Sequence, residues 1–117
     1  MENKRKLGSE KESVAAAYLE ASGLQILDRN YYFPGGEIDI VAKDNEYLVF
    51  VEVKFRKNAA YGVPSEAVTK GKQKKLVYGA KYYMYGNHFP FHTPCRFDVI
   101  SIEGDEITWI QNAFMAG

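Results

Sequence analysis

Two acids and a lysine lie at positions that favour metal-dependent chemistry. Asp39 falls in an alternating apolar–polar run at residues 37–42, and Glu52 and Lys54 fall in the next such run, residues 47–54. Side chains two residues apart on a strand project to the same face, so Glu52 and Lys54 share a face. Two facing carboxylates repel each other and attract a cation, and a few oxygen ligands suit Mg²⁺ or Mn²⁺. Lys54 adds positive charge where charge develops on a substrate.

The turn between the two runs decides whether these side chains meet. A two-residue turn at Asp44 and Asn45 sets Asp39 diagonal to Glu52, and a four-residue loop sets Asp39 directly opposite Glu52. Either register leaves both carboxylates and Lys54 on one face, whereas a slip of one residue separates them. Phosphodiester hydrolysis needs an ion, an activated water and a positive charge, so the pattern predicts a metal-dependent nuclease site. A solvated sheet face with a cross-strand ion pair is the alternative.

The periodicity of the chain predicts the elements that hold these residues. A helix is expected over residues 9–22, with Ser9 as its N-cap and Glu12 as the capping-box partner. Strands are expected at 24–33, 37–42 and 47–54, a second helix capped by Ser65, and strands at 95–102 and 106–110. This order, helix, three strands, helix, two strands, predicts an α/β fold with a mixed sheet flanked by helices.

Composition limits the class of protein. The chain has 117 residues, 46% hydrophobic and 26% charged, which predicts one soluble globular domain over residues 1–117. We expect no membrane association and no secretory signal, because no apolar run is long enough for a span or follows the basic N-terminal residues. The one cysteine, Cys95, cannot form an internal disulfide, which favours a cytoplasmic location.

Basic residues concentrate in the middle of the chain although the net charge is zero. Between Lys54 and Lys81 the only acid is Glu66. Such a segment presents a positive face to a nucleic-acid backbone, although a solvated helix face is the alternative interpretation. The residues expected to contact DNA are Arg56, Lys57, Lys70, Lys72, Gln73, Lys74 and Lys75.

Asp98 is another acid inside an apolar run. It lies two residues from Arg96, so the two side chains share a strand face. This spacing predicts an ion pair in place of a catalytic role.

Three segments carry a family resemblance. They are residues 36–42 (GEIDIVA), 49–56 (VFVEVKFR) and 95–100 (CRFDVI). Together they resemble the YraN-like family of predicted bacterial endonucleases, which is similar to archaeal Holliday-junction resolvases and belongs to the PD-(D/E)XK nuclease superfamily. The resemblance extends over nearly the whole chain.

The resemblance implies a restriction-endonuclease-like core and a Mg²⁺- or Mn²⁺-dependent endonuclease acting on DNA, with branched or structured DNA expected by analogy with resolvases. It places Asp39, Glu52 and Lys54 at catalytic positions and Asp39, Glu52 and Glu12 at metal-binding positions. Glu12 matches the first-helix glutamate of resolvase-like members, although Lys11 stands where the family has glycine. Metal binding and helix capping therefore both stay open for Glu12.

Two other functions remain open on the sequence. One is a non-catalytic nucleic-acid-binding module of DNA repair or recombination, and the other is a protein-interaction domain with a relic site. An enzyme of this size that cuts two strands needs two active sites, so this function is compatible with a symmetric homodimer, although no residue of the sequence indicates one.

Overall fold

The structure is a computed structural model and describes residues 4–56 and 68–116. Neither described helix is long and apolar enough to span a membrane. The element order is the predicted one and is confirmed. The elements are α1 (Lys4–Ala21), β1 (Gln25–Phe33), β2 (Gly36–Asp44), β3 (Tyr47–Arg56), α2 (Lys70–Gly86), β4 (Cys95–Glu103) and β5 (Glu106–Phe114).

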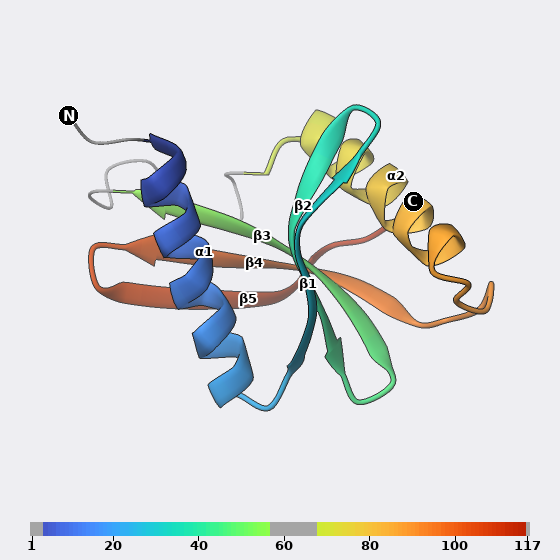
Figure 1. Cartoon of the computed structure of the whole chain (residues 1–117), viewed down its shortest axis with the longest axis horizontal. Coiled ribbons are helices and arrows are strands. Elements are labelled where there is room, and N and C mark those ends of the chain that lie inside the picture. The colour runs from blue at the N-terminus through green and yellow to red at the C-terminus, as the bar shows by residue number, and fades with distance from the viewer. Residues whose placement is uncertain (1–3, 57–67, 117) are drawn as a thin grey trace.

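The five strands form one sheet in the order β1-β2-β3-β4-β5. Strands β3 and β4 run parallel and every other neighbouring pair is antiparallel, so the predicted mixed sheet is confirmed. The parallel pair requires a crossover connection, which contains α2. In Figure 1, α1 crosses β3, β4 and β5, while α2 lies alongside the β1–β2 hairpin.

Side chains of the central strands pack into two separate apolar cores. Val41 and Phe50 pack in the core with α2, whereas their chain neighbours Ile40 and Val51 pack in the core with α1. Successive side chains of a strand point to opposite faces. The two helices therefore cover opposite faces of the sheet, and a residue at a strand face is reached from one helix or the other.

A glycine brings α2 close to the sheet. Gly79 is buried in the middle of the helix, and a Cβ at this position would collide with the ring of Phe33. Glycine destabilises the interior of a helix. At this position no larger residue fits, because the ring of Phe33 occupies the space that a side chain would need. Leu76 and Ala80 flank this contact and are buried against the same core.

The predicted start of the first helix is wrong. Helix α1 already begins at Lys4, so Ser9 lies inside it and its carbonyl accepts a hydrogen bond from Oγ of Ser13 at 3.0 Å. The residues before Ser9 are mostly good helix formers, and they extend the helix past Gly8. A capping box between Ser9 and Glu12 is thereby excluded.

The predicted cap of the second helix is also wrong. Helix α2 begins at Lys70 and its N-cap is Thr69, whose Oγ1 accepts a hydrogen bond from the backbone N–H of Lys72 at 3.2 Å. Ser65 lies outside the described residues. Serine and threonine both favour the N-cap, so local sequence could not choose between these two positions.

Candidate metal centre

The turn between β2 and β3 sets the register of the site. Asp44 pairs with Tyr47, so the turn residues are Asn45 and Glu46 and not the predicted Asp44 and Asn45. Asn45 has a left-handed φ of 56°, a conformation that asparagine tolerates. The resulting register sets Asp39 directly opposite Glu52. This is the register that was expected from a four-residue loop.

Strands β2 and β3 separate where these two acids lie. The last paired residues are Ile40 and Val51, although β2 extends back to Gly36 and β3 extends on to Arg56. Figure 1 shows the β1–β2 hairpin leaning away from β3 beyond this point. The backbone N–H of Val53 donates to Oδ2 of Asp39 at 2.8 Å. The side chain of Asp39 thus accepts the hydrogen bond of a β3 N–H group, in a region where the backbones of β2 and β3 are no longer paired.

Strand β2 twists sharply at Asp39. Ile38 packs in the core with α2, whereas Ile40, two residues later, packs in the core with α1. Side chains two residues apart share a face on a regular strand, so the strand rotates between them. On β1, Asn30 lies between the partners of Ile40 and Ile38 and has a left-handed φ of 54°. Asp39 therefore lies at the point where β2 rotates about its own axis.

Three carboxylates gather at this twist. Glu12 of α1, Glu37 and Asp39 each have an oxygen within 4.8 Å of the others. Glu12 has no capping role, and its carboxylate belongs to this acidic cluster. Glu37 was not predicted as a site residue, although it lies two positions from Asp39 on the same strand. Strand parity, the rule that grouped Glu52 with Lys54, could have included it.

Glu52 lies beside this cluster and is paired on one oxygen only. Its Oε1 is 3.6 Å from Nζ of Lys54 and 3.8 Å from Nζ of Lys72. Its Oε2 is buried and accepts no hydrogen bond from any residue in the described part of the chain. Lys54 thus lies where it was predicted, whereas Lys72 was predicted only as a DNA contact and here reaches a site carboxylate.

Burial and mutual repulsion raise the pKa values of these acids. Burial first, and then the charge of Glu52, raise the pKa of Asp39 to about 8. Burial is also the main cause that raises the pKa of Glu12, followed by the charge of Glu37. Burial raises the pKa of Glu52 as well, against the opposing charges of Lys72 and Lys54. In the absence of a cation, these effects favour the protonated form of Asp39 near neutral pH.

The donor set suits a hard divalent cation. It consists of carboxylates only, contributed by α1, β2 and β3, with one buried oxygen of Glu52 left without a hydrogen-bond donor among the described residues. Mg²⁺ and Mn²⁺ prefer such oxygen ligands, and a cation removes the repulsion that otherwise keeps Asp39 protonated. The residues present therefore fit a metal of this kind.

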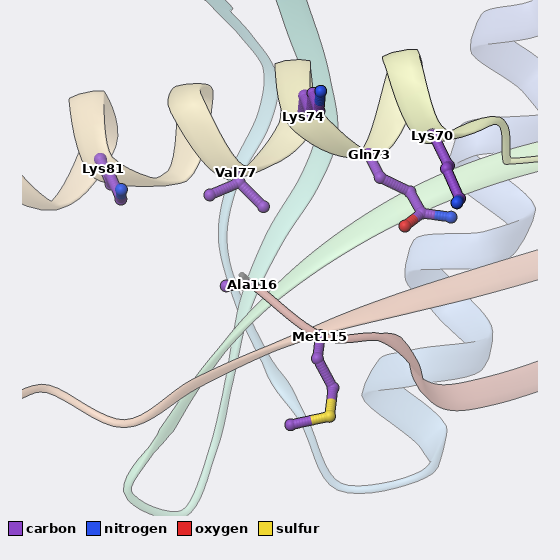
Figure 2. Close-up of a pocket in the computed structure, with 7 residues that line it drawn as sticks. All are labelled: Lys70, Gln73, Lys74, Val77, Lys81, Met115 and Ala116. Atoms are coloured by element: carbon purple, nitrogen blue, oxygen red, sulfur yellow. The ribbon is translucent and has the colours of Figure 1, made fainter.

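The basic residues of α2 divide into two groups. Lys72 faces Glu52, whereas Lys70, Lys74 and Lys81 lie on another side of the helix and line a groove of about 550 Å³. Figure 2 shows Lys70, Gln73 and Val77 projecting from α2 toward the side on which the C-terminal residues lie. The full lining is Lys70, Gln73, Lys74, Val77, Lys81, Met115 and Ala116.

The remaining predicted DNA contacts lie elsewhere. Nε2 of Gln73 donates to the carbonyl of Val68 at 3.1 Å, which ties the first turn of α2 to the preceding segment. Lys75 is exposed and outside the groove lining, and Arg56 is the last residue of β3. Lys57 lies outside the described residues.

Asp98 is held by donors, and the predicted ion pair with Arg96 is confirmed. Nε of Arg96 lies 3.1 Å from Oδ1 of Asp98. Nε1 of Trp109 donates to Oδ2 at 2.9 Å, and the backbone N–H of Asn112 donates to Oδ1 at 2.9 Å. Arg96 also reaches Oδ2 of Asp44 at 2.9 Å. This network accounts for Asp98 without any catalytic role.

Related proteins cover the whole of this region. Residues 11–102 match the family described as "Uncharacterised protein family UPF0102". A UPF0102 protein of Lachnoclostridium phytofermentans is 54% identical over 114 residues, covering 97% of this chain and 97% of that protein. One of Saccharophagus degradans is 45% identical over 107 residues, covering 92% and 91%. One of Carboxydothermus hydrogenoformans is 44% identical over 112 residues, covering 96% and 94%.

Proposed function

This chain belongs to the uncharacterised protein family UPF0102, and from that premise we propose that it is a Mg²⁺- or Mn²⁺-dependent DNA endonuclease. The observation that carries the proposal is the set of carboxylates where β2 and β3 separate, of which Asp39 and Glu52 are buried. Glu12, Glu37 and Asp39 converge there, and Glu52 has one buried oxygen that no described residue satisfies. A purely structural site would pair these acids with donors, as buried polar groups generally are.

The fold supports the same proposal. We assign the chain a restriction-endonuclease-like core of the PD-(D/E)XK kind, as its sequence resemblance implies. The mixed sheet, the crossover through α2 and the position of the acids on β2 and β3 agree with that assignment. A cytoplasmic location belongs to the same proposal, because an enzyme of this kind acts where the DNA is.

Each side chain has a separate role in the proposed reaction. Glu12, Asp39 and Glu52 hold the cation, with Glu37 beside them as a fourth carboxylate. A bound metal of this type lowers the pKa of a water and polarises the scissile phosphate. Lys54, whose Nζ is 3.6 Å from Glu52, orients the attacking water or stabilises the negative charge that grows on the phosphate. A cation bound there would favour the deprotonated form of Asp39.

Nucleic acid approaches this site along α2. The groove lined by Lys70, Lys74 and Lys81 has no acid among the described residues that line it, so its charge suits a phosphate backbone. Arg56 adds a further basic residue at the end of β3, two positions after Lys54. A symmetric dimer would present two sites to the two strands of branched DNA.

A nuclease assay with a matched lysine control tests the proposal. Linear, flapped, four-way and single-stranded DNA are incubated with the protein in Mn²⁺ or in chelator. We expect cleavage in Mn²⁺ only, and a loss of about 10²–10³ in rate for Lys54→Ala, the usual effect of removing one charge-stabilising donor. Lys43→Ala, which removes an exposed lysine of β2, should cleave like the wild type.

Two results would count against catalysis. Equal cleavage by folded Lys54→Ala would remove Lys54 from the mechanism and point to a contaminating nuclease. DNA binding in chelator with no cleavage of any substrate in Mn²⁺ would favour the non-catalytic nucleic-acid-binding module of repair or recombination.

A further inference from the structure

Lys72 occupies an unusual position for a lysine on α2. It lies four residues before Leu76, and Leu76 is followed at intervals of four and three by Ala80 and Tyr83, all of them buried. Residues at these intervals share one face of a helix. Lys72 therefore continues the core-facing stripe of α2 toward its N-terminus, where an apolar residue would be the ordinary choice.

The position is explained by what Lys72 meets. Its Nζ lies 3.8 Å from Oε1 of Glu52, the same oxygen that Lys54 approaches to 3.6 Å. The side chain of Lys72 nevertheless remains 39% exposed, whereas that of Glu52 is only 7% exposed. Lys72 thus neutralises a buried carboxylate from one side and is open to solvent, and to a dissolved polyanion, from the other.

The two lysines differ in their freedom to leave Glu52. Lys54 lies two residues away on β3 and is tied to Glu52 by the strand itself. Lys72 comes from another element, at the start of a helix whose lysines Lys70 and Lys74 line a basic groove on another side of the helix. A phosphate that arrives at this end of α2 competes with Glu52 for the ammonium group of Lys72. The positive end of the helix dipole at the start of α2 adds to the attraction.

We propose that Lys72 is a positioning residue that restrains Glu52 until a nucleic-acid phosphate takes the lysine, so that nucleic acid and metal bind cooperatively. The inference rests on the proposed function, since it concerns the same carboxylate. Without nucleic acid, a cation must compete with Lys72 for Glu52. With nucleic acid bound, Lys72 pairs with phosphate and the Glu52 carboxylate is freed for the metal.

Thermodynamic reciprocity makes the proposal measurable from either side. If DNA raises the affinity for the metal by some factor, the metal raises the affinity for DNA by the same factor. Coupling between sites commonly lies between about 5-fold and 150-fold. Lys72→Met keeps the length and the apolar stem of the side chain but removes its charge, so it should uncouple the two ligands.

The experiment measures Mn²⁺ binding by calorimetry, with and without a short DNA duplex that is checked by gel to be uncut. Ca²⁺ replaces Mn²⁺ if cutting occurs. In wild-type protein we expect DNA to tighten metal binding by about tenfold, within the usual range of coupling. In Lys72→Met we expect metal binding without DNA to be tighter by roughly fivefold, the size of a half-exposed ion pair, and the effect of DNA to shrink by the same factor.

Two further variants separate a specific role from a general change of charge. Lys43→Met removes an equal charge from an exposed position on β2, outside the predicted DNA contacts, and should leave the coupling at its wild-type value. Lys72→Arg keeps a cation beside Glu52 and should restore most of the coupling. Thermal melting without ligand checks that all the variants are folded.

The outcomes distinguish this inference from the proposed function. Metal binding that responds to DNA equally in wild type and Lys72→Met would overturn the role of Lys72 and leave the metal site intact. Metal binding without any coupling to DNA in the wild type would overturn it too. Absence of metal binding in every protein would overturn the metal site and this inference together.

Discussion

Two buried aspartates of one sheet have opposite surroundings. Asp98 on β4 is 1% exposed and meets Arg96, the indole N–H of Trp109 and a backbone N–H. Asp39 on β2 is 9% exposed and receives a backbone N–H from Val53, but its charged neighbours are Glu12, Glu37 and Glu52. The same side chain at similar depth is satisfied on β4 and repelled on β2, with only β3 between the two strands.

The two aspartates differ in how the cost of their burial is compensated. Burying a carboxylate is costly unless donors or a cation compensate for the lost water. Around Asp98 the chain supplies the compensation itself, so the site is complete. Around Asp39 it supplies further acids, so compensation must come from protons or from a metal. This residue pattern, which is unfavourable for folding alone, is the reason for proposing a metal at Asp39 and none at Asp98.

The largest expected effect is the loss of stability on removing Asp98. Asp98→Ala leaves the partly buried guanidinium of Arg96 without its main partner and should lower the free energy of unfolding by about 3 kcal/mol. Asp39→Ala, which removes a repelled acid, should cost much less in metal-free buffer. Urea unfolding of the two variants measures both values. Equal losses would mean that the two aspartates are both structural.

The second effect concerns metal and should be confined to the other aspartate. Mn²⁺ at a hundredfold excess over its Kd should stabilise wild-type protein by about 2.7 kcal/mol. Asp39→Asn should lose most of this shift, because an amide replaces a charged oxygen ligand. Asp98→Asn, although less stable, should keep it. Melting curves with and without Mn²⁺ give the shift for each protein, and a full shift in Asp39→Asn would remove Asp39 from the ligand set.

The smallest effect, per pH unit, is a pH dependence. The folded-state pKa of Asp39 is raised from 3.8 to about 8, so the native state holds a proton that the unfolded chain releases. The contribution of this group to stability is therefore largest below pH 4 and is lost as the pH rises to about 8. Metal-free Asp39→Asn should gain in stability relative to wild type across this interval.

Metal affinity should follow the opposite trend. Metal binding competes with the proton of Asp39. The Kd for Mn²⁺ should therefore fall as the pH rises towards 8, by up to about tenfold per pH unit. Calorimetry in buffers of different ionisation enthalpy counts the protons released. A pH-independent Kd between pH 6 and pH 8 would contradict a protonated Asp39 in the metal-free site.

The sequence alone determined the element order, the mixed sheet and the positions of the chief site residues. Strand alternation is local, with a period of two, so it placed Glu52 and Lys54 on one face before any contact was known. The ion pair of Arg96 with Asp98 follows from the same rule. Helix starts were predicted less well, because Ser9, Ser65 and Thr69 carry equivalent capping groups and the choice depends on what packs around them.

Only the tertiary structure decided which residues from different elements share the site. The sequence left Glu12 between capping and metal binding, and the earlier start of α1 excluded capping and placed its carboxylate beside Glu37 and Asp39. It gave Lys72 the same role as its neighbours, and the approach of α2 to β3 set it against Glu52. Local periodicity fixes the face on which a side chain lies, but the twist of β2 and the packing of both helices fix what it meets.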